Sequence, residues 1–348
     1  MIKNIIFICT GLKGGAKKYI EQHIDHNKKK NIFLISIKPK QNYNIKYNNN
    51  ISLFDESVLG NASRAKRTLS RLVKNLDLKE TVIFITNYAI LVKFFFLFRS
   101  LQKKGIKIVI TLHSGLLNIT LLNLIAAFVF SFCIFSSDKI IYGSESSRKW
   151  WFKFFPWIKM KNSKIIHNGI CLHSFKKRNK NKVKNISFVG RVEHENDPEF
   201  FCKLARSTNL SKTNSYKFHV FGDGSLKKRL LLKYKKFIKF HGWSPEKKIY
   251  NISDIVIITS FVNNFPYVAL ESFSHGIPVV TLSKGDITKI VINKKNGLII
   301  KKRNPEMLNK ILKYVIKNYN YLSKNSYETA KKFDEKKSCS NIWNYILK

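Results

Sequence analysis

Short apolar runs alternate with longer amphipathic stretches along almost the whole chain. The runs are rich in Ile and Val and lack polar alternation, which is typical of strands buried on both faces of a parallel sheet. The stretches between them have the spacing of helices that cover such a sheet. The expected strands lie near residues 3–8, 31–37, 81–87, 107–113, 139–144 and 163–169, and near 186–191, 216–222, 237–243, 254–260, 278–282 and 297–300. The pattern therefore predicts an α/β protein.

One polar, Lys-rich stretch after Phe175 interrupts this pattern and has the composition of a linker. At roughly 150 residues per domain, a chain of 348 residues also favours two domains. We therefore predict one Rossmann-like domain over residues 1–175 and a second over residues 176–320. Residues 321–348 are expected to form a polar helical tail with apolar residues near its end.

The net charge of +43 leaves three kinds of partner open. Such a charge suits an anionic membrane surface, a nucleic acid, or a solvated coat with no partner. Lys and Arg are spread along the chain, and no nucleic-acid reading module or focused basic stripe is visible. Nucleic acid is therefore the least favoured of the three.

The five cysteines stand far apart, and no Cys-x-x-Cys or Cys/His cluster appears in the sequence. Neither a disulfide framework nor a zinc site is supported, and scattered reduced thiols fit a cytoplasmic protein. The N-terminal apolar run is too short for a signal peptide and ends in a Gly-rich turn.

Residues 119–135 form the longest apolar segment and approach the lower length limit of a membrane span, about 17–25 residues. A run that resembles a buried strand follows almost at once. A helix packed against its domain, with one face dipping into lipid, is therefore favoured over a true span.

Ligands of parallel α/β sheets bind beyond the carboxyl ends of the strands, so the residues that follow each strand are candidates. Gly14 and Gly15 follow the first expected strand, where helix N–H groups could face an anion. His113 ends the run KIVITLH and could donate a hydrogen bond to a substrate hydroxyl. A plain tight turn and a structural histidine are the ordinary alternatives.

Two more candidates follow the first two strands of the second domain. Arg191 opens a loop after ISFVG, and its planar guanidinium matches the oxygens of a diphosphate. A surface arginine is the alternative. Gly222 lies in the turn FGDGS, which either caps a helix or lines a nucleotide cleft.

The segment SFVNNFPYVALESFSHGIPVV has the features of a site. Pro266 fits the first turn of a helix that runs from about Tyr267 and stops at Gly276. The N–H groups of its first turn would suit a phosphate. Glu271 lies one turn inside this otherwise apolar helix, and its carboxylate must find donors, either ribose hydroxyls or a lysine.

A series of these motifs, in order, resembles the retaining glycosyltransferases of family 4. The segments are TLH, ISFVGRVEHENDPEFF, FHVFGDG, NNFPYVALESFSHGIPVV and NKKNGLII. The resemblance covers nearly the whole chain and implies the GT-B fold, in which two Rossmann-like parallel-sheet domains face each other across a cleft. It also implies that the tail helix returns to the N-terminal domain.

The resemblance implies roles for the candidate residues. Arg191 would bind the diphosphate of a nucleotide sugar, with Gly14 and Gly15 near it, and Glu271 would hold the ribose. His113 would contact the transferred sugar. The remaining donor-binding residues would be Gly222, Phe265, Pro266, Tyr267 and Val268.

Two positions depart from the family pattern. Asn263 stands where the family has the first Glu of its Glu-x7-Glu motif, and Asn196 stands where it has a Lys near the diphosphate. Asn still donates and accepts hydrogen bonds, so an active enzyme of a subfamily that uses Asn at these positions is favoured. The alternative is a catalytically inactive homologue that acts as a binding or scaffold protein.

The implied reaction moves a sugar from a nucleoside diphosphate to an acceptor hydroxyl with retention of configuration. No Asp-x-Asp occurs, so a metal ion is not expected. No cofactor is expected either, because the nucleoside diphosphate sugar is the donor substrate. The apolar segment and the basic surface suit a lipid-linked glycan acceptor at an anionic inner leaflet. By analogy the protein would act in bacterial lipopolysaccharide, O-antigen or capsule synthesis, as a cytoplasmic protein bound peripherally to the inner face of the plasma membrane.

Overall fold

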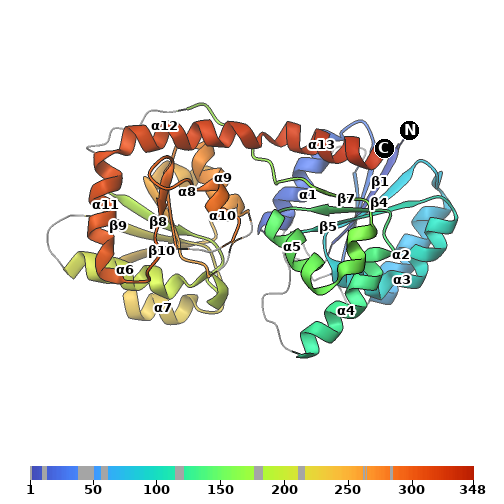
Figure 1. The fold of residues 1–348 in the computed structure, drawn as a ribbon, viewed down its shortest axis with the longest axis horizontal. Coiled ribbons are helices and arrows are strands. Elements are labelled where there is room, and N and C mark those ends of the chain that lie inside the picture. Colours follow the sequence, from blue (N-terminus) through green and yellow to red (C-terminus); the bar gives the residue numbers. More distant parts are fainter. Residues whose placement is uncertain are drawn as a thin grey trace. The chain divides into compact units, whose positions relative to one another are not determined.

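The computed structural model describes residues 2–9, 14–37, 51–55, 62–113, 121–175, 183–210, 216–261, 263, 265–282 and 285–348. The chain divides into two compact units (Figure 1). The N-terminal unit contains Met1–Asn168 together with Glu335–Lys348, and the C-terminal unit contains Gly169–Asp334. Most of the predicted linker lies outside the described residues.

The N-terminal unit is built on a seven-stranded parallel sheet in the order β3-β2-β1-β4-β5-β6-β7. Its strands are β1 (Asn4–Cys9), β2 (Asn31–Ser36), β3 (Ile51–Asp55), β4 (Thr81–Ile85), β5 (Lys107–Leu112), β6 (Lys139–Tyr142) and β7 (Ser163–Ile165). Every residue of β1 and β4 is buried, as expected for Ile-rich strands inside a parallel sheet. In register, Ile5 lies opposite Ile32 on one side and Val82 on the other.

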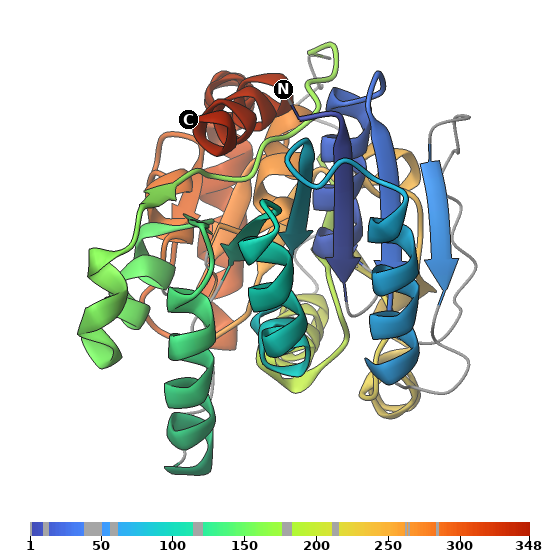
Figure 2. The same ribbon diagram turned by 90° about the vertical axis from the view of Figure 1, so that its right-hand side faces the viewer.

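Helices cover both faces of this sheet. They are α1 (Gly14–His26), α2 (Ala62–Lys74), α3 (Tyr88–Lys103), α4 (Leu121–Phe135), α5 (Glu145–Phe154), the 3₁₀ turn η2 (Pro156–Met160) and α13 (Glu335–Leu347). Alternate side chains of a strand point to opposite faces. Ile6 and Ile8 of β1 pack with Leu69 of α2 and Phe94 of α3, and Figure 2 shows these two helices in front of the strands.

The opposite face of the same sheet carries an aromatic cluster that holds α13. Phe7 of β1 and Phe84 of β4 lie 5.5 Å apart between ring centroids. His23 of α1 and Trp343 of α13 pack against Phe84, at 5.3 and 6.1 Å. The indole N–H of Trp343 donates to His23 Nδ1 at 3.2 Å. The C-terminal helix is therefore part of the N-terminal core.

The C-terminal unit has a six-stranded parallel sheet in the order β10-β9-β8-β11-β12-β13. Its strands are β8 (Asn185–Val189), β9 (Lys217–Phe221), β10 (Ile238–Gly242), β11 (Ile255–Ile258), β12 (Val279–Thr281) and β13 (Gly297–Ile299). Its helices and 3₁₀ turns are η4 (His194–Asn196), α6 (Pro198–Leu210), α7 (Lys227–Tyr234), α8 (Glu246–Ile252), α9 (Tyr267–Ser274), α10 (Ile287–Ile290), η5 (Pro305–Met307), α11 (Leu308–Lys317), α12 (Tyr319–Ala330) and η6 (Lys331–Phe333).

Two apolar layers, one on each face, stabilise this second sheet. Phe188 of β8 packs with Phe201 of α6 and Leu312 of α11. On the other face, Val256 of β11 packs with Phe273 of α9 and Tyr250 of α8. The prediction of two Rossmann-like parallel-sheet domains is confirmed.

Two details differ from the sequence-based expectation. The short strand β3 was not among the expected strands. The predicted tail, residues 321–348, is divided between the units, and only the part from Glu335 onward belongs to the N-terminal unit. The reason is that α12 is fastened to the C-terminal unit, where Ser323 Oγ donates to Gly276 O at 2.6 Å and Ser326 Oγ donates to Asn296 O at 2.9 Å.

Residues 121–135 of the apolar segment predicted at 119–135 form α4, which extends beyond the other helices of its unit in both ribbon views (Figures 1 and 2). Residues 119 and 120 lie outside the described part of the chain. In the part of the chain that the structure describes, no helix is both long and apolar enough to cross a membrane.

Candidate functional site

The C-terminal sheet has its topological switch point between β8 and β11. From these neighbouring central strands the chain proceeds to β9 and β10 on one side and to β12 and β13 on the other. Ligands of open α/β sheets bind beyond the carboxyl ends of the strands at such a point. The loops that leave β8 and β11 meet here, since Thr259 Oγ1 donates to Asn196 O at 2.9 Å and Phe261 N donates to Glu195 O at 3.3 Å.

Arg191 lies in the loop after β8 and is largely exposed. Its Nη2 atom lies 2.7 Å from Glu195 Oε1, and 70% of its side chain is accessible. An exposed ion pair of this kind contributes little to stability, because solvent screens it. The guanidinium is therefore held near the switch point by a partner that an incoming anion could displace.

Asn196, a predicted donor-binding residue, uses its side chain to brace the loop. Its Nδ2 atom donates to Arg191 O at 2.9 Å, and its Oδ1 atom accepts from Ser260 Oγ at 3.2 Å. The next residue, Asp197, has a left-handed backbone with φ 42°. The contacts of Asn196 fix the loop that carries Arg191.

Arg303 is a residue of this region that the sequence analysis missed. Its Nη2 atom donates to Asp197 Oδ2 at 2.5 Å and to Thr259 O at 2.7 Å. Its guanidinium lies over the rings of Phe200 and Phe261, at 4.8 and 4.7 Å. It fastens the β8 and β11 loops together. Nothing in its local sequence KKRN distinguishes it from the many other basic residues.

Gly222, at the end of β9, is required by close backbone packing. Its φ is 135°, and a Cβ atom there would lie 1.9 Å from Gly190 O. Its N–H donates to Gly242 O at 2.8 Å, so the loops after β8, β9 and β10 are in contact through glycines. This packing requires a glycine at position 222 whether or not a ligand binds nearby.

The helix α9 begins close to its predicted start. Pro266 is extended, with φ −73° and ψ 134°, and serves as the N-cap rather than the first helical residue. Phe265 is buried and has φ 64°, a strained conformation for an aromatic residue. Gly276, with φ 65°, ends the helix as predicted, and its N–H donates to Phe273 O at 2.9 Å.

Other predicted residues of this segment lie on the same loop and helix. Asn263 is half-buried, and its carbonyl accepts from Ile287 N at 3.2 Å, which connects the loop to α10. Tyr267 and Val268 are half-buried in the first turn of α9.

Glu271 is half-buried on α9, and its carboxylate is oriented by a tyrosine of α8. The Tyr250 hydroxyl donates to Glu271 Oε2 at 2.7 Å. Tyr250 is fully buried, and burial together with the charge of Glu271 raises its pKa well above the ordinary value. The phenol therefore stays protonated and acts as a donor. The sequence analysis considered a lysine or a ligand as the partner and missed the tyrosine.

His113 follows β5 in the N-terminal unit. Its ring packs edge-on against Tyr19 of α1 at 4.9 Å, and a Cβ atom at Gly143 would lie 2.7 Å from His113 Nδ1. Burial lowers the pKa of His113 to about 4. The imidazole is therefore neutral at pH 7 and suited to hydrogen bonding rather than to carrying a charge.

Gly14 and Gly15 begin α1 and are exposed. Gly14 has φ 52°, and no heavy atom lies within 4 Å of the position that a Cβ atom would take. Residues 10–13, which precede them, lie outside the described part of the chain. These glycines and His113 belong to the N-terminal unit, whereas the other predicted site residues belong to the C-terminal unit.

The described residues include one group with potential metal ligands close together, formed by His173, Glu246 and His275. All three lie in the C-terminal unit. The sequence analysis found no metal-binding motif, because these residues are too far apart in the chain to form one.

Residues 172–335 match the protein family Glycosyl transferases group 1. An uncharacterized glycosyltransferase of Methanocaldococcus jannaschii is 30% identical over 133 residues, which cover 36% of this chain and 34% of that protein. The α-1,4-N-acetyl-D-galactosaminyltransferase of Campylobacter jejuni, whose name gives an undecaprenol-linked acceptor, is 27% identical over 157 residues, covering 43% of this chain and 44% of the relative. The matched segments thus span less than half the length of these relatives.

Among solved structures, Anabaena HepE in complex with UDP-glucose has a TM-score of 0.79 over 99% of both chains at 16% identity. This likeness extends over both units and establishes the fold. The structural likeness shows the GT-B fold for both units, and the family match covers residues 172–335. The matched segment, residues 172–335, coincides almost entirely with the C-terminal unit.

Proposed function

We propose that the protein transfers a sugar from a nucleoside diphosphate sugar to an acceptor hydroxyl with retention of anomeric configuration and without a metal ion. One observation carries this proposal. In the unit that matches the family, the loops at the switch point and helix α9 present an exposed guanidinium, the N-terminus of a helix and an oriented carboxylate.

The diphosphate would bind to the cationic part of this site. Arg191 exchanges its exposed contact with Glu195 for phosphate oxygens, which its planar fork matches. The N–H groups of the first turn of α9, after Phe265 and Pro266, add the positive end of a helix dipole. These donors stabilise the charge that develops on the leaving nucleoside diphosphate.

The ribose would bind to Glu271. Its carboxylate can accept from two neighbouring hydroxyls, and the hydrogen bond from Tyr250 restricts its rotation beforehand. Orienting a group before the ligand arrives lowers the entropy cost of binding.

The transferred sugar would contact His113 and Asn263. A neutral imidazole donates one hydrogen bond and accepts another, and an amide does both. The leaving phosphate accepts the proton of the acceptor hydroxyl, and the new glycosidic bond forms on the face from which the phosphate departs. This route needs no carboxylate nucleophile, in contrast to retaining glycosidases.

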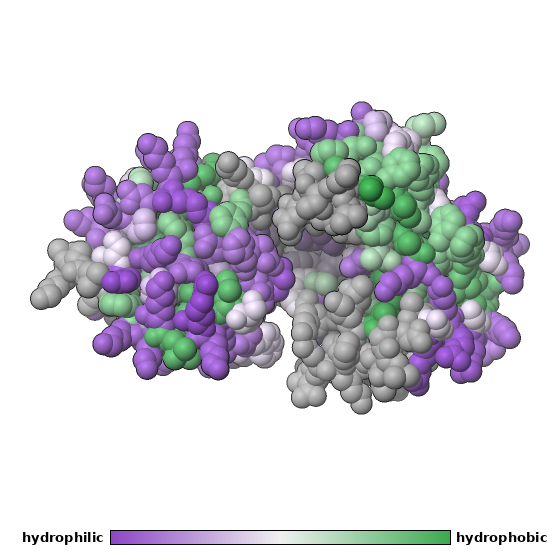
Figure 3. Space-filling view, turned by 90° about the horizontal axis from the view of Figure 1, so that it is seen from below, coloured by the Kyte–Doolittle hydropathy of each residue, from purple (hydrophilic) through white to green (hydrophobic). Residues whose placement is uncertain are grey.

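The acceptor would be a lipid-linked glycan at an anionic leaflet. Helix α4 exposes Ile125, Phe128, Val129 and Phe132, each with between 46 and 56% of its surface accessible. Figure 3 shows hydrophobic residues gathered on the N-terminal unit, in the right half of the view. A large apolar surface is typical of a membrane or partner contact, and a net charge of +43 favours anionic lipid. The name of the Campylobacter jejuni relative gives a lipid-linked acceptor. A similar acceptor for this chain would give it a role in lipopolysaccharide, O-antigen or capsule synthesis.

A screen of nucleoside diphosphate sugars for thermal stabilisation tests the donor, because a ligand that binds only the native state raises the melting temperature. We expect one class of nucleotide to stabilise the wild type and to lose most of this effect in Arg191→Ala. Arg229→Ala is the matched control, since Arg229 is an exposed arginine that pairs with Glu199 in the same unit. Stabilisation by none of the nucleotides would refute the proposal.

The second candidate is an inactive homologue that binds a nucleotide sugar but does not transfer it. The observation behind it is that Asn196 braces its own loop and provides no cation. Release of nucleoside diphosphate in the presence of acceptor distinguishes the two, because a scaffold protein would bind the donor and release none.

A further inference from the structure

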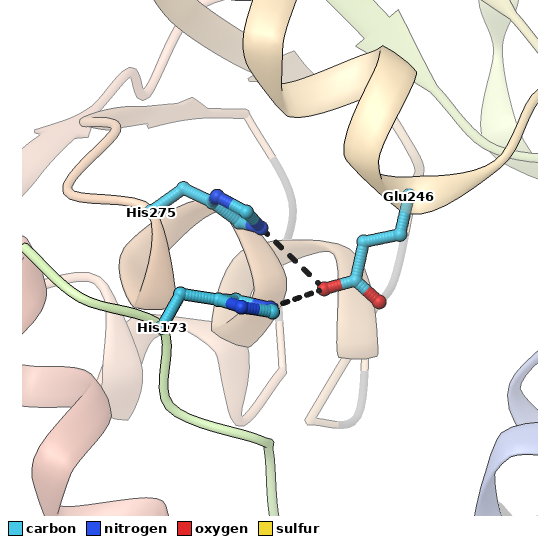
Figure 4. A group of neighbouring side chains, drawn as sticks. All are labelled: His173, Glu246 and His275. Atoms are coloured by element: carbon cyan, nitrogen blue, oxygen red, sulfur yellow. Dashed lines mark hydrogen bonds and ion pairs between the residues drawn. The ribbon is translucent and has the colours of Figure 1, made fainter. Parts of the chain in front are cut away.

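Three segments of the C-terminal unit bring two imidazoles to one carboxylate (Figure 4). His173 lies in the segment that enters the unit after β7, Glu246 is the first residue of α8, and His275 is the C-cap of α9. His173 Nε2 lies 3.3 Å from Glu246 Oε1, and His275 Nε2 lies 3.5 Å from the same oxygen. The ligand atoms of all three residues lie within 4.8 Å of one another.

The side chain of His275 favours a ligand at this cluster. Its Nε2 atom is buried, and among the described residues it has no hydrogen-bond partner. The Glu246 oxygen lies near it, but not in hydrogen-bond geometry. The two imidazole rings are stacked, with centroids 4.3 Å apart and planes 28° apart.

We propose that His173, Glu246 and His275 bind a divalent transition-metal ion, with Zn²⁺ as the preferred occupant. Two imidazole nitrogens and one carboxylate oxygen form a donor set that zinc uses in proteins, with ligand distances of about 2.0–2.2 Å. Two ligands at that distance in a tetrahedral site lie about 3.4 Å apart. The two observed nitrogen–oxygen distances, 3.3 and 3.5 Å, match this spacing.

The fit requires only a small adjustment. The ligand atoms of the two histidines lie within 4.8 Å of each other, and any excess over the tetrahedral spacing has to close on binding. The His173 side chain can make this movement because 42% of it is accessible, whereas the His275 side chain is only 15% accessible. Three protein ligands leave one position for water, and the partial exposure of His173 and Glu246 gives the ion a path from solvent.

Neighbouring contacts fix the backbone around these ligands. The Tyr327 hydroxyl donates to His173 O at 2.7 Å, and His275 N donates to Glu271 O at 3.3 Å. The Tyr250 ring stacks on His275 at 5.0 Å with planes 20° apart. A bound ion would connect the entering segment to α8 and α9 and thereby stabilise the C-terminal unit. The cluster adjoins the proposed ribose site, because Tyr250 contacts both His275 and Glu271, but the metal proposal does not rest on the proposed function.

The test uses the full-length protein, without a polyhistidine tag and stripped of metal with a chelator. We expect isothermal titration with ZnCl₂ to give one site per chain, and Co²⁺ to produce visible absorption bands of imidazole and carboxylate coordination. Zn²⁺, but not Mg²⁺, should raise the melting temperature, because the ion binds only the native state.

Three variants connect this binding to the cluster. His173→Ala, Glu246→Gln and His275→Ala should each raise the dissociation constant for Zn²⁺ at least tenfold, whereas the exposed His194→Ala should leave it unchanged. His173→Ala and Glu246→Gln change partly exposed side chains, and circular dichroism will show that they fold. Absence of Zn²⁺ binding, or binding that these two folded variants retain, would overturn the proposal.

Discussion

At the scale of single residues, the candidate site depends on side chains that prepare others for a ligand. Tyr250 orients Glu271, and Asn196 fixes the loop that carries Arg191. These supporting residues are buried or braced, whereas Arg191 itself is exposed. A rigid support behind an accessible group is what a binding site needs, because the ligand then meets donors and acceptors already in position.

Glu271→Gln should abolish most binding of the nucleotide sugar that stabilises the wild type, and Tyr250→Phe should weaken it about fivefold. The second figure corresponds to about 1 kcal/mol, a typical net contribution of one hydrogen bond. Isothermal titration measures both. Tyr319→Phe is the control, because it removes a buried tyrosine bond to Asp254 O in the same unit. Equal loss of affinity in Tyr250→Phe and Tyr319→Phe would contradict the positioning role.

His23 should make the N-terminal unit sensitive to acid. Burial lowers its pKa from 6.5 to about 3. Below pH 6.5 the unfolded state therefore binds a proton that the folded state excludes, and stability is lost as the pH falls toward 3. At pH 5 this loss amounts to about 2 kcal/mol.

Urea unfolding at pH 7.5 and 5.0 measures the loss. His23→Gln, which keeps an acceptor for Trp343, should reduce the difference in unfolding free energy between the two pH values. His194→Gln changes an exposed histidine and should not alter it. An unchanged difference in His23→Gln would show that another group causes the acid sensitivity.

At the scale of elements, close backbone packing and exposed apolar faces have opposite consequences. The glycines after β8, β9 and β10 let three loops pack together. Helix α4, in contrast, leaves aromatic side chains uncovered. The first feature stabilises the sheet that carries the site, and the second is available to a partner.

Gly222→Ala should destabilise the C-terminal unit by several kcal/mol, because the new Cβ atom would lie 1.9 Å from Gly190 O. Gly14→Ala is the matched comparison. Gly14 also has a positive φ, but the space around it is open, so its replacement should lower the free energy of unfolding by only about 1 kcal/mol. Thermal unfolding separates the two, and a similar cost at both positions would show that the backbone at Gly222 adjusts.

Phe128→Ser combined with Phe132→Ser should reduce binding to vesicles that contain anionic lipid, since it removes exposed apolar area from α4. Flotation at low and high salt measures this binding, and the remaining electrostatic part should fall with salt. Trp243→Ser, at an exposed aromatic residue of the other unit, serves as the control. Undiminished flotation of the α4 variant would exclude this helix as the membrane contact.

At the scale of the whole molecule, the chain enters the C-terminal unit once and returns to complete the N-terminal one. The segment that returns is the last helix, α13, in which Ile342, Trp343 and Ile346 are buried. The N-terminal unit is therefore completed by residues that follow the whole of the other unit in sequence. Folding of the N-terminal core depends on the end of the chain.

Deletion of Glu335–Lys348 should unfold or severely destabilise the N-terminal unit, because it exposes the aromatic face formed by Phe7, Phe84 and His23. Hydrogen exchange should show lost protection in β1 and β4 and preserved protection in β8 and β11. Deletion of Lys348 alone is the control. Full protection of β1 in the longer deletion would contradict this role of α13.

Much of the fold could be predicted from local sequence. The Ile- and Val-rich runs became buried parallel strands, and Gly276 ended α9 where expected. The strand β3 was missed because its short sequence ISLFD carries little periodicity. The division of the tail was missed because α12 and α13 have similar composition, and only their contacts assign them to different units.

The amino-acid order alone was sufficient to predict the parallel α/β class, and it selected most of the residues that we propose as a donor site, since strand burial and turn glycines leave local patterns. The partners of those residues emerged only once the elements had packed. Tyr250 and Glu271 are 21 residues apart, His173 and Glu246 are 73 apart, and Asp197 and Arg303 are 106 apart. Such contacts depend on how helices and loops meet around the sheet, and a periodic pattern along the chain carries no record of that.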